Sequence, residues 1–390
     1  MKADRLIKVT AGVLIVGTLA ACSGTSIEAT STPQPEPERT PTHLPTDVPI
    51  KTPESTFTPK PLPTEAPTVE ASPIPEPTAQ PTETAVTDVY GREFIFSQDK
   101  DGQFDIYKAI EGSDGRLQDS IDITNSDESN ELNAQPFEKD KIVYTKTDKD
   151  WSNSQIALKD LTTGEEKLLT GDNKGNWDPT GIEINGEKRI LYKSDNDIYI
   201  MNRDGSNKTN LTPDRKATEE WNPIPMTISN PDGTKTQKIL FVSRLDPNGR
   251  KGVPDNSDEI FVMNTDGSEI KQLTKNDVPD WFGRPITEDS TDTPIEIVFI
   301  SNSEPKKPEG ETQPPDNLFT MKIDGKRRIQ ITFSKTDMGD PISDSARKRI
   351  IALLNDGTNY NIVSLDLNGE NIRPIEEEDG NILSPAILNR

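Results

Sequence analysis

The sequence predicts an all-β fold, in which residues 89–390 form a six-bladed β-propeller that the C-terminal strand closes. Three observations carry this prediction. A hairpin pattern recurs six times, each copy continues into a further short strand, and a proline-marked strand is offset by one step from the hairpins. Repeats of this kind, rich in short strands and poor in helix signals, are typical of propellers.

The repeated hairpin consists of two apolar runs and a turn. Short runs rich in β-branched and aromatic residues predict buried strands. The first runs begin at residues 93, 141, 189, 238, 296 and 349, and the second runs begin at 105, 155, 197, 259, 317 and 361. The turn ends on glycine, mostly after Asp or Asn, because glycine adopts a positive φ without steric penalty. The turn glycines are Gly115, Gly164, Gly205, Gly267, Gly325 and Gly369.

A third strand follows each turn and ends on Ile-Thr or Leu-Thr in five of the six copies. The sixth copy, "ENIRPI", lacks the threonine. Consecutive turn glycines are 41 to 62 residues apart, which leaves room for a fourth strand in each copy. The threonines are Thr124, Thr170, Thr212, Thr274 and Thr332.

The fourth strand of each blade is marked by proline and precedes the hairpin. No such strand precedes the hairpin at residue 93, whereas "ILSPAILN" follows the sixth hairpin near the end of the sequence. We therefore expect this last strand to pair with the strand at 93 and to close the ring, which removes open sheet edges. The marking prolines are Pro136, Pro179, Pro223 or Pro225, Pro285, Pro341 and Pro385.

The repeat unit resembles the TolB-like (WD-like) propeller repeats of bacterial envelope proteins, over all of 89–390. "DIYIMNRDG" and "EIFVMNTDG" match the hairpin of that family, and "NPDG" at 230–233 keeps part of its opening motif. The chain departs from the family pattern at Ser343 and Ala346, where Trp and Asp are usual. The resemblance implies the fold, but the same fold carries several activities, so function must be argued from sites.

The N-terminus predicts export. A basic segment precedes an apolar run over 9–21, which is too short to span a membrane and suits the core of a signal peptide. The run ends in "LAAC", which resembles the lipobox of bacterial lipoproteins. The resemblance implies a signal peptide over 1–21 and a lipid on Cys22, the only cysteine; the alternative is an ordinary secretory signal. We expect a protein anchored to the cell membrane or outer membrane, with its propeller outside the cytoplasm.

Residues 22–88 predict a disordered tether. The segment holds fifteen of the 33 prolines, with threonine and glutamate in most of the gaps. It cannot bury enough apolar surface to offset its chain entropy, and its prolines keep it extended. We interpret it as a spacer; glycosylation of its threonines or a docking motif for a partner are the alternatives.

Composition argues against several classes of function. Asp and Glu number 67 against 44 Lys and Arg, a net charge of −23, whereas nucleic-acid binding needs concentrated basic residues. The only histidine, His43, lies in the tether, so a serine nucleophile in 89–390 would have no histidine base. Lyases on related propellers hold their metal through histidines, so they are disfavoured as well. We expect no enzyme and no cofactor, with a carboxylate-based hydrolase or lyase as a remote alternative.

One loop offers a weak calcium candidate. "DKDGQFD" carries Asp99, Asp101 and Asp105 at alternating positions. It does not fit an EF-hand, since glycine stands at the fourth position and Ile110 at the twelfth. We favour a polar loop between two strands.

The tryptophans indicate a working face. In a four-stranded antiparallel blade, the segment that leads into the proline-marked strand lies on the same face as the loop between the two apolar runs of a hairpin. The glycine turns lie on the opposite face. Three tryptophans precede proline-marked strands, a fourth lies in a hairpin loop, and the longest insertions, 244–258 and 302–316, map to the same face. Two interpretations stay open: wedges packed between blades, or a recognition surface of Trp, Arg and carboxylates. The candidates are Trp151, Trp177, Asp178, Glu220, Trp221, Asp280, Trp281 and Arg284.

Two hypotheses follow for function. The first is a non-catalytic, monomeric, lipid-anchored module that binds an envelope protein or peptide through this face. The second is a glycan-binding lipoprotein that stacks sugar rings on the tryptophans. Stacking needs open tryptophan faces beside carboxylates, whereas protein binding would use the long loops and a broader patch.

Overall fold

The computed structural model describes residues 91–100, 102–172, 174–213, 219–230, 232–244, 258–287, 294–304, 314–376 and 380–388. The expected signal peptide, Cys22, the tether, Asp101 and most of both long insertions lie outside these residues. In the described part of the chain, no helix is long and apolar enough to cross a membrane.

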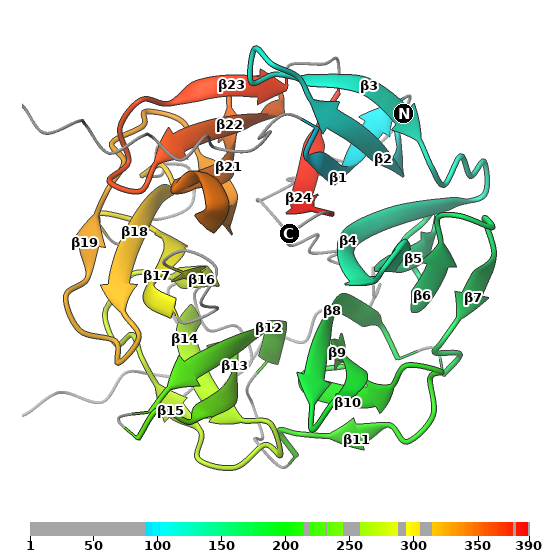
Figure 1. Ribbon diagram of the computed structural model, residues 1–390, viewed down its shortest axis with the longest axis horizontal. Coiled ribbons are helices and arrows are strands. Elements are labelled where there is room, and N and C mark those ends of the chain that lie inside the picture. Colours follow the sequence, from blue (N-terminus) through cyan, green and yellow to red (C-terminus); the bar gives the residue numbers. More distant parts are fainter. Residues whose placement is uncertain are drawn as a thin grey trace, which may run out of the picture. The chain divides into compact units, whose positions relative to one another are not determined.

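Six four-stranded antiparallel sheets form a ring, as predicted (Figure 1). The innermost strands, nearest the central axis, are the proline-marked ones. They are β24 (Ile382–Ile387), β4 (Ser129–Glu138), β8 (Asn176–Ile184), β12 (Glu219–Ser229), β16 (Asp280–Thr287) and β20 (Met338–Asp344). Proline is tolerated there because an inner strand is a sheet edge, where a missing N–H costs no ladder bond.

The two apolar runs of each hairpin form the middle strands of a blade. The second strands are β1 (Glu93–Lys100), β5 (Lys141–Asp148), β9 (Glu187–Ser194), β13 (Lys235–Arg244), β17 (Pro294–Ser301) and β21 (Arg349–Asn355). The third strands are β2 (Gln103–Glu111), β6 (Ser154–Asp160), β10 (Asp197–Asn202), β14 (Asp258–Asn264), β18 (Asn317–Lys322) and β22 (Tyr360–Asp366). The outer strands are β3 (Leu117–Asp122), β7 (Glu166–Leu168), β11 (Thr209–Asn210), β15 (Lys271–Gln272), β19 (Ile329–Gln330) and β23 (Arg373–Glu376).

The Ile-Thr or Leu-Thr ending connects the outer strand to the third strand and to the next blade. In each of the five copies that carry it, the threonine hydroxyl oxygen accepts a hydrogen bond from a third-strand N–H, as from Ile198 to Thr212 at 3.0 Å. In four of these copies the residue before the threonine lies directly against the turn glycine of the next blade. A Cβ on Gly205, whose φ is +88°, would lie 2.7 Å from the carbonyl oxygen of Leu169. Adjacent copies of the repeat therefore interlock.

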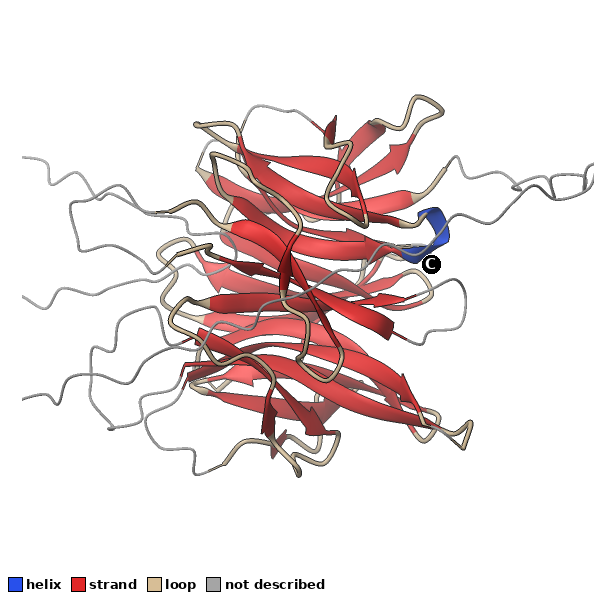
Figure 2. Cartoon of the chain, turned by 90° about the vertical axis from the view of Figure 1, so that its left-hand side faces the viewer, coloured by secondary structure: helices blue, strands red, loops and turns tan. Residues whose placement is uncertain are grey.

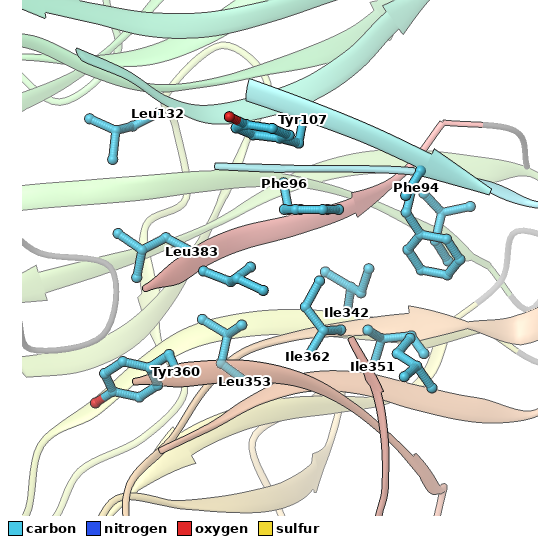
Figure 3. Packing of buried hydrophobic residues seen from close by; sticks show 14 of the residues in the cluster. Phe94, Phe96, Tyr107, Leu132, Ile342, Ile351, Leu353, Tyr360, Ile362 and Leu383 are labelled. Carbon is cyan, nitrogen blue, oxygen red and sulfur yellow. The ribbon is translucent and has the colours of Figure 1, made fainter. Parts of the chain in front are cut away.

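The C-terminal strand closes the ring, as predicted. β24 pairs with β1 in antiparallel register, with Phe94 opposite Ile387 and Gln98 opposite Ile382. Figure 3 shows the core beneath this joint, where Phe94 and Phe96 pack with Leu383 and with residues of the last blade. Closure thus depends on a strand and on a shared hydrophobic cluster.

A buried ionic cluster strengthens the same joint. Arg349 donates hydrogen bonds to Glu111 of the first blade at 2.7 and 3.0 Å and to Asp344 of its own blade at 2.9 Å. Arg92 pairs with Asp344 at 2.7 Å, and Arg347 also contacts Glu111. The carboxylates are at most 2% exposed, so these charges are neutralised within the cluster.

The two ends of the ring differ, and we name them by their connections. The upper face holds the loops between second and third strands and the segments that lead into inner strands. The lower face holds the Asp-Gly turns and the connections from inner to second strands. Among the latter is the 3₁₀ turn η3 (Ser345–Arg347), which stands at one end of the molecule in the side view (Figure 2).

Candidate functional site at the axis and upper face

All six inner strands share a β-bulge at the same place. Pairing with the second strand shifts register there, and one residue of each bulge has a positive φ between 38° and 55°. Asn and Asp tolerate this conformation best among residues with a Cβ. Bulges re-aim side chains and are frequent near functional sites. The six bulge residues are Asn133, Asp178, Asn222, Phe282, Asp340 and Ser384.

The polar bulge residues are linked by a chain of hydrogen bonds around the axis. Asn133 donates its amide to Asp178 at 2.5 Å, and Asp178 also accepts the N–H of Asn222 at 3.1 Å. Across the ring, Asp340 accepts the N–H of Ser384 at 3.1 Å in the same manner. Each Asp thus holds the backbone of the next blade, which ties the blades together at their narrowest point.

Two further contacts extend this network. The hydroxyl of Ser384 donates to the side-chain oxygen of Asn133 at 2.7 Å, which joins the first blade to the second. The fifth blade has the apolar Phe282 at its bulge, and Arg284, two residues later, donates to the side-chain oxygen of Asn222 at 2.5 Å. We name these six residues, Asn133, Asp178, Asn222, Arg284, Asp340 and Ser384, the axial ring.

Burial governs the charges of the axial ring. Burial raises the pKa of Asp178 to about 6, although Lys193, the N–H of Asn222 and Arg284 favour its charged form. Burial also raises the pKa of Asp340, against the opposing effect of Arg284. Arg284 therefore serves as the positive charge between two carboxylates that are costly to ionise.

Two cavities meet at the axial ring. The upper cavity, about 20 Å³, has room for roughly one water molecule and is lined by the bulge residues. The lower cavity, about 650 Å³, follows the lower halves of the inner strands. The residues that line both are Gln135, Thr180, Ile224, Arg284 and Ile342.

The tryptophans divide into two pairs, of which one is buried and the other half-buried. Trp221 and Trp281 are 4% and 7% exposed and belong to one core cluster with Val298 and Ile300. Both side chains pack within this cluster, so they are wedges between blades. The guanidinium of Arg244 also covers the ring of Trp221 at 5.1 Å.

Trp151 and Trp177 instead form a half-buried stack at the upper face. Their ring centroids lie 6.4 Å apart with an interplanar angle of 12°, and Phe104 meets Trp151 edge-on at 6.3 Å. The residue Trp151 has a φ of +64°, and its N–H donates to the carbonyl of Asp148 at 2.8 Å. Such a conformation is uncommon for a bulky residue, and strain of this kind concentrates at functional sites.

The predicted carboxylates beside Trp221 and Trp281 do not lie at the surface. Glu220 is fully buried and accepts hydrogen bonds from Thr212 at 3.2 Å and Ser243 at 3.3 Å. Asp280 is fully buried as well, 2.6 Å from the amide of Asn276. Both occupy the position two residues before the bulge residue, where a carboxylate joins neighbouring strands instead of facing a ligand.

Sequence reasoning named two axial residues, Asp178 and Arg284, and missed the other four. A signal for three of the missed residues was present, because a polar residue stands directly before a proline in "NPI", "DPI" and "SPA". Asn133 precedes alanine and has no such mark. The polar-Pro pair follows from the bulge, which needs a residue that tolerates positive φ and then one without an N–H to donate.

The carboxylates of the weak calcium candidate accept hydrogen bonds from neighbouring loop residues. Asp99 accepts the N–H of Gly102 at 2.9 Å, and Asp105 accepts the hydroxyl of Thr124 at 3.1 Å and the N–H of Ser126 at 2.9 Å. Asp101 lies outside the described residues. Within the described ranges, no group of three or more His, Cys, Asp or Glu side chains is placed to hold a metal ion.

Comparisons with known proteins support the fold. No family model and no curated protein matches the chain. Among solved structures, it is similar to TolB from Acinetobacter baumannii, with 16% identity and a TM-score of 0.52 over 76% of this chain and 66% of that chain, just under two thirds of the TolB length. It is also similar to a chain of a nidogen/laminin complex, with 12% identity and a TM-score of 0.53 over 77% and 99% of the two chains.

A third similar structure is hydrazine synthase from Kuenenia stuttgartiensis, with 12% identity and a TM-score of 0.56 over 76% of this chain and 47% of that chain. At such identities the likeness establishes a TolB-like propeller fold. It does not extend to activity, since the similar structures include an enzyme as well as propellers of other kinds.

Proposed function

We propose that this protein is a non-catalytic, lipid-anchored propeller of the cell envelope that binds a protein or peptide partner through its upper face. The observation that carries the proposal is the half-buried stack of Trp151 and Trp177. Tryptophan dominates binding hot spots, and here one of the pair is held in a strained conformation. It acts as a monomer in this proposal.

The N-terminal end of the propeller lies at the lower face, away from the proposed binding surface. The N–H of Gly91 donates to the carbonyl of Glu111 at 3.0 Å, and Glu111 is the last residue of β2, at the lower face. The chain therefore joins the propeller opposite the tryptophan stack. The upper face therefore does not carry the point of attachment and stays accessible to a partner.

Stacking of the two rings favours a protein over a glycan. A sugar ring needs an open aromatic face, whereas Trp151 and Trp177 each occupy part of the other's surroundings and Phe104 lies against Trp151. The half-exposed remainder of both rings suits an apolar side chain of a partner. The chains similar to this one include TolB and a propeller solved in a nidogen/laminin complex, which agrees with a protein-binding use of the fold.

The experiment that tests the proposal is site-specific photo-crosslinking in cells with the full-length chain. A photoreactive phenylalanine replaces Trp151 or Trp177, and a matched one replaces Leu168, an apolar residue of outer strand β7 that is 51% exposed. We expect one discrete adduct from the tryptophan positions and none from Leu168. Equal adducts from all three positions, or none from the stack, would reject the upper face as the binding surface.

A further inference from the structure

Glu131 of inner strand β4 is a buried acid with part of its hydrogen-bonding capacity unmet. Its side chain is fully buried, and the carboxyl oxygen Oε2 has no hydrogen-bond partner, while Oε1 accepts the hydroxyl of Ser129 at 2.6 Å. Lys146, opposite on β5, lies 3.8 Å from Glu131 but 2.7 Å from Glu166. Tyr144 of β5 also faces Glu131 and donates its hydroxyl to Glu166. Lys146 therefore pairs mainly with Glu166 and only weakly offsets a charge on Glu131.

A second acid faces Glu131 across the junction between blades one and two. This acid is Asp105 of β2, a strand that packs against β4. Its Oδ1 accepts the N–H of Ser126 at 2.9 Å, and the hydroxyls of Ser126 and Ser129 lie 2.7 Å apart, so the two acids belong to one hydrogen-bonded chain. Burial raises the pKa of Glu131 to about 8; Asp105 adds to the increase, and Ser129 and Lys146 oppose it. Glu131 therefore carries a proton in neutral solution.

The residues next to the two acids position the tryptophan stack. Phe104 directly precedes the acid of β2, and Asn130 directly precedes the acid of β4. The N–H of Phe104 donates to the side-chain oxygen of Asn130 at 3.0 Å, and its ring meets Trp151 edge-on. The amide nitrogen of Asn130 donates at 3.4 Å to the carbonyl of Asp148, which also accepts the N–H of Trp151. The strands that bring the acids together thus also hold Trp151.

The next junction, between blades two and three, has the same arrangement with amides in place of the acids. Gln155 occupies the place of Asp105, because each accepts the hydroxyl of the threonine that ends the outer strand of its blade. Asn176 occupies the place of Glu131, because each stands two residues before the bulge residue. An amide carries no charge at any ordinary pH. The stack of Trp151 and Trp177 therefore lies between one junction that can gain or lose a proton and one that cannot.

We propose that Glu131 is a proton-dependent switch for the tryptophan stack. Protonated, it lets blades one and two close, with Phe104 against Trp151. Without the proton, its buried charge is repelled by Asp105 and needs water, so the junction opens and the stack loosens. An open, hydrated junction restores an ordinary pKa to Glu131, so each pH unit below the raised value changes the ratio of open to closed junctions by up to about tenfold. The effect on the stack is independent of the proposed function, whereas the effect on partner binding rests on it.

The first test is fluorine NMR of the full-length chain containing 5-fluorotryptophan, whose four tryptophan signals are assigned with single Trp→Phe variants. We expect the Trp151 signal to move with pH, with a midpoint near pH 8, and Glu131→Gln to abolish the movement. Glu259→Gln is the matched control and should leave it unchanged. Glu259 is a buried acid of blade four, and burial raises its pKa to about 7. A Trp151 signal that stays constant between pH 6 and pH 9, or that titrates unchanged in Glu131→Gln, would overturn the proposal.

Two further substitutions test the electrostatic cause, and they serve as well should Glu131→Gln fail to fold. Asp105→Asn removes the like charge but keeps an oxygen for Thr124 and Ser126, so the midpoint should move to lower pH. Lys146→Met removes the opposite charge, so the midpoint should move to higher pH. Movements in the reverse directions, or none in either variant, would contradict control by Glu131.

The consequence for binding is measured by photo-crosslinking in membrane fractions at pH 6 and pH 9. A photoreactive phenylalanine replaces Trp177, which leaves Trp151 in place. We expect a yield of adduct about tenfold lower at pH 9, and equal yields at both pH values when Glu131→Gln is added. A Trp151 signal that titrates as expected without any adduct would reject the proposed function and leave the switch intact. An adduct whose yield does not depend on pH, or depends on it equally in Glu131→Gln, would reject the link between the switch and binding.

Discussion

Asp178 and its counterparts in the other blades share one backbone conformation and differ in what their side chains hold. The bulge places the residue at positive φ toward the axis, and the side chain before it packs between blades in the case of Trp221 and Trp281. Asp178 therefore accepts hydrogen bonds from two neighbouring blades, while Trp177, one position earlier, reaches the upper face. A single residue step separates an axial role from a packing role.

At the residue scale, the tryptophans should differ in their effect on stability. Trp221→Ala and Trp281→Ala should each lower the free energy of unfolding by about 3–5 kcal/mol, because each leaves a cavity between blades. Trp177→Ala should cost about 1–2 kcal/mol, since its ring is half-buried. Thermal melts of the three variants make the comparison. A uniform loss in all three would contradict the division into wedges and stack.

Glu131 should make the stability of the propeller depend on pH. Burial raises its pKa to about 8, while the hydroxyl of Ser129 and the charge of Lys146 favour its charged form and Asp105 opposes it. A carboxyl with a raised folded-state pKa stabilises the fold when protonated, so stability should fall as pH rises from about 4.5 to 8. Glu131→Gln should remove on the order of 2–4 kcal/mol of this decrease.

The measurement is chemical unfolding at pH 5 and pH 8, with Glu183→Gln as the control, because Glu183 is exposed. The gap in stability between Glu131→Gln and the unmodified protein should widen toward pH 8. A gap that is constant with pH would show that Glu131 is not protonated in the folded state at pH 5.

At the scale of elements, the Asp-Gly turns should serve two functions that substitution can separate. Gly205 and Gly233 both have a positive φ, but a Cβ on Gly205 would meet Leu169 of the neighbouring blade, whereas a Cβ on Gly233 meets nothing within 4 Å. Gly233→Ala should cost about 1–2 kcal/mol for the backbone conformation alone. Gly205→Ala should cost clearly more. Equal melting temperatures would mean that the turn of blade three does not pack against blade two.

The sequence was sufficient to predict the strands, because their order depends on local patterns that each copy repeats. Apolar runs, glycine turns and prolines located all the inner strands, including the closing strand at Pro385. The exposure of side chains such as Glu220 and Trp281 could not be predicted in this way. It depends on the bulge and on the facing blade, which are set by register between strands and not by spacing along the chain.

The axial ring was predicted only in part for the same reason. Its members come from different blades, and neighbours such as Ser384 and Asn133 are 251 residues apart in the sequence. Asp178 and Arg284 were predicted because they stand close to tryptophans in the sequence. The sequence did not indicate that their side chains meet on the axis. Asp340 and Ser384 became visible only when the closed ring brought all inner strands to one centre.

At the scale of the whole molecule, stability should depend on the last strand. Removing residues 381–390 should leave β1 with an open edge and expose Phe94 and Phe96, so we expect aggregation or loss of a cooperative melt. Removing only residues 389–390 is the control, because both lie beyond β24. A chain shortened at 381 that melts at the original temperature would refute closure by this strand.

Trp151→Asn in the full-length chain tests most directly whether the upper face binds a partner through the tryptophan stack. Asn adopts positive φ more readily than Trp, so the melting temperature should change little. Affinity for the cross-linked partner should fall at least tenfold, since hot-spot truncations cost about 2 kcal/mol or more. An unchanged affinity with an unchanged melting temperature would contradict binding through the tryptophan stack.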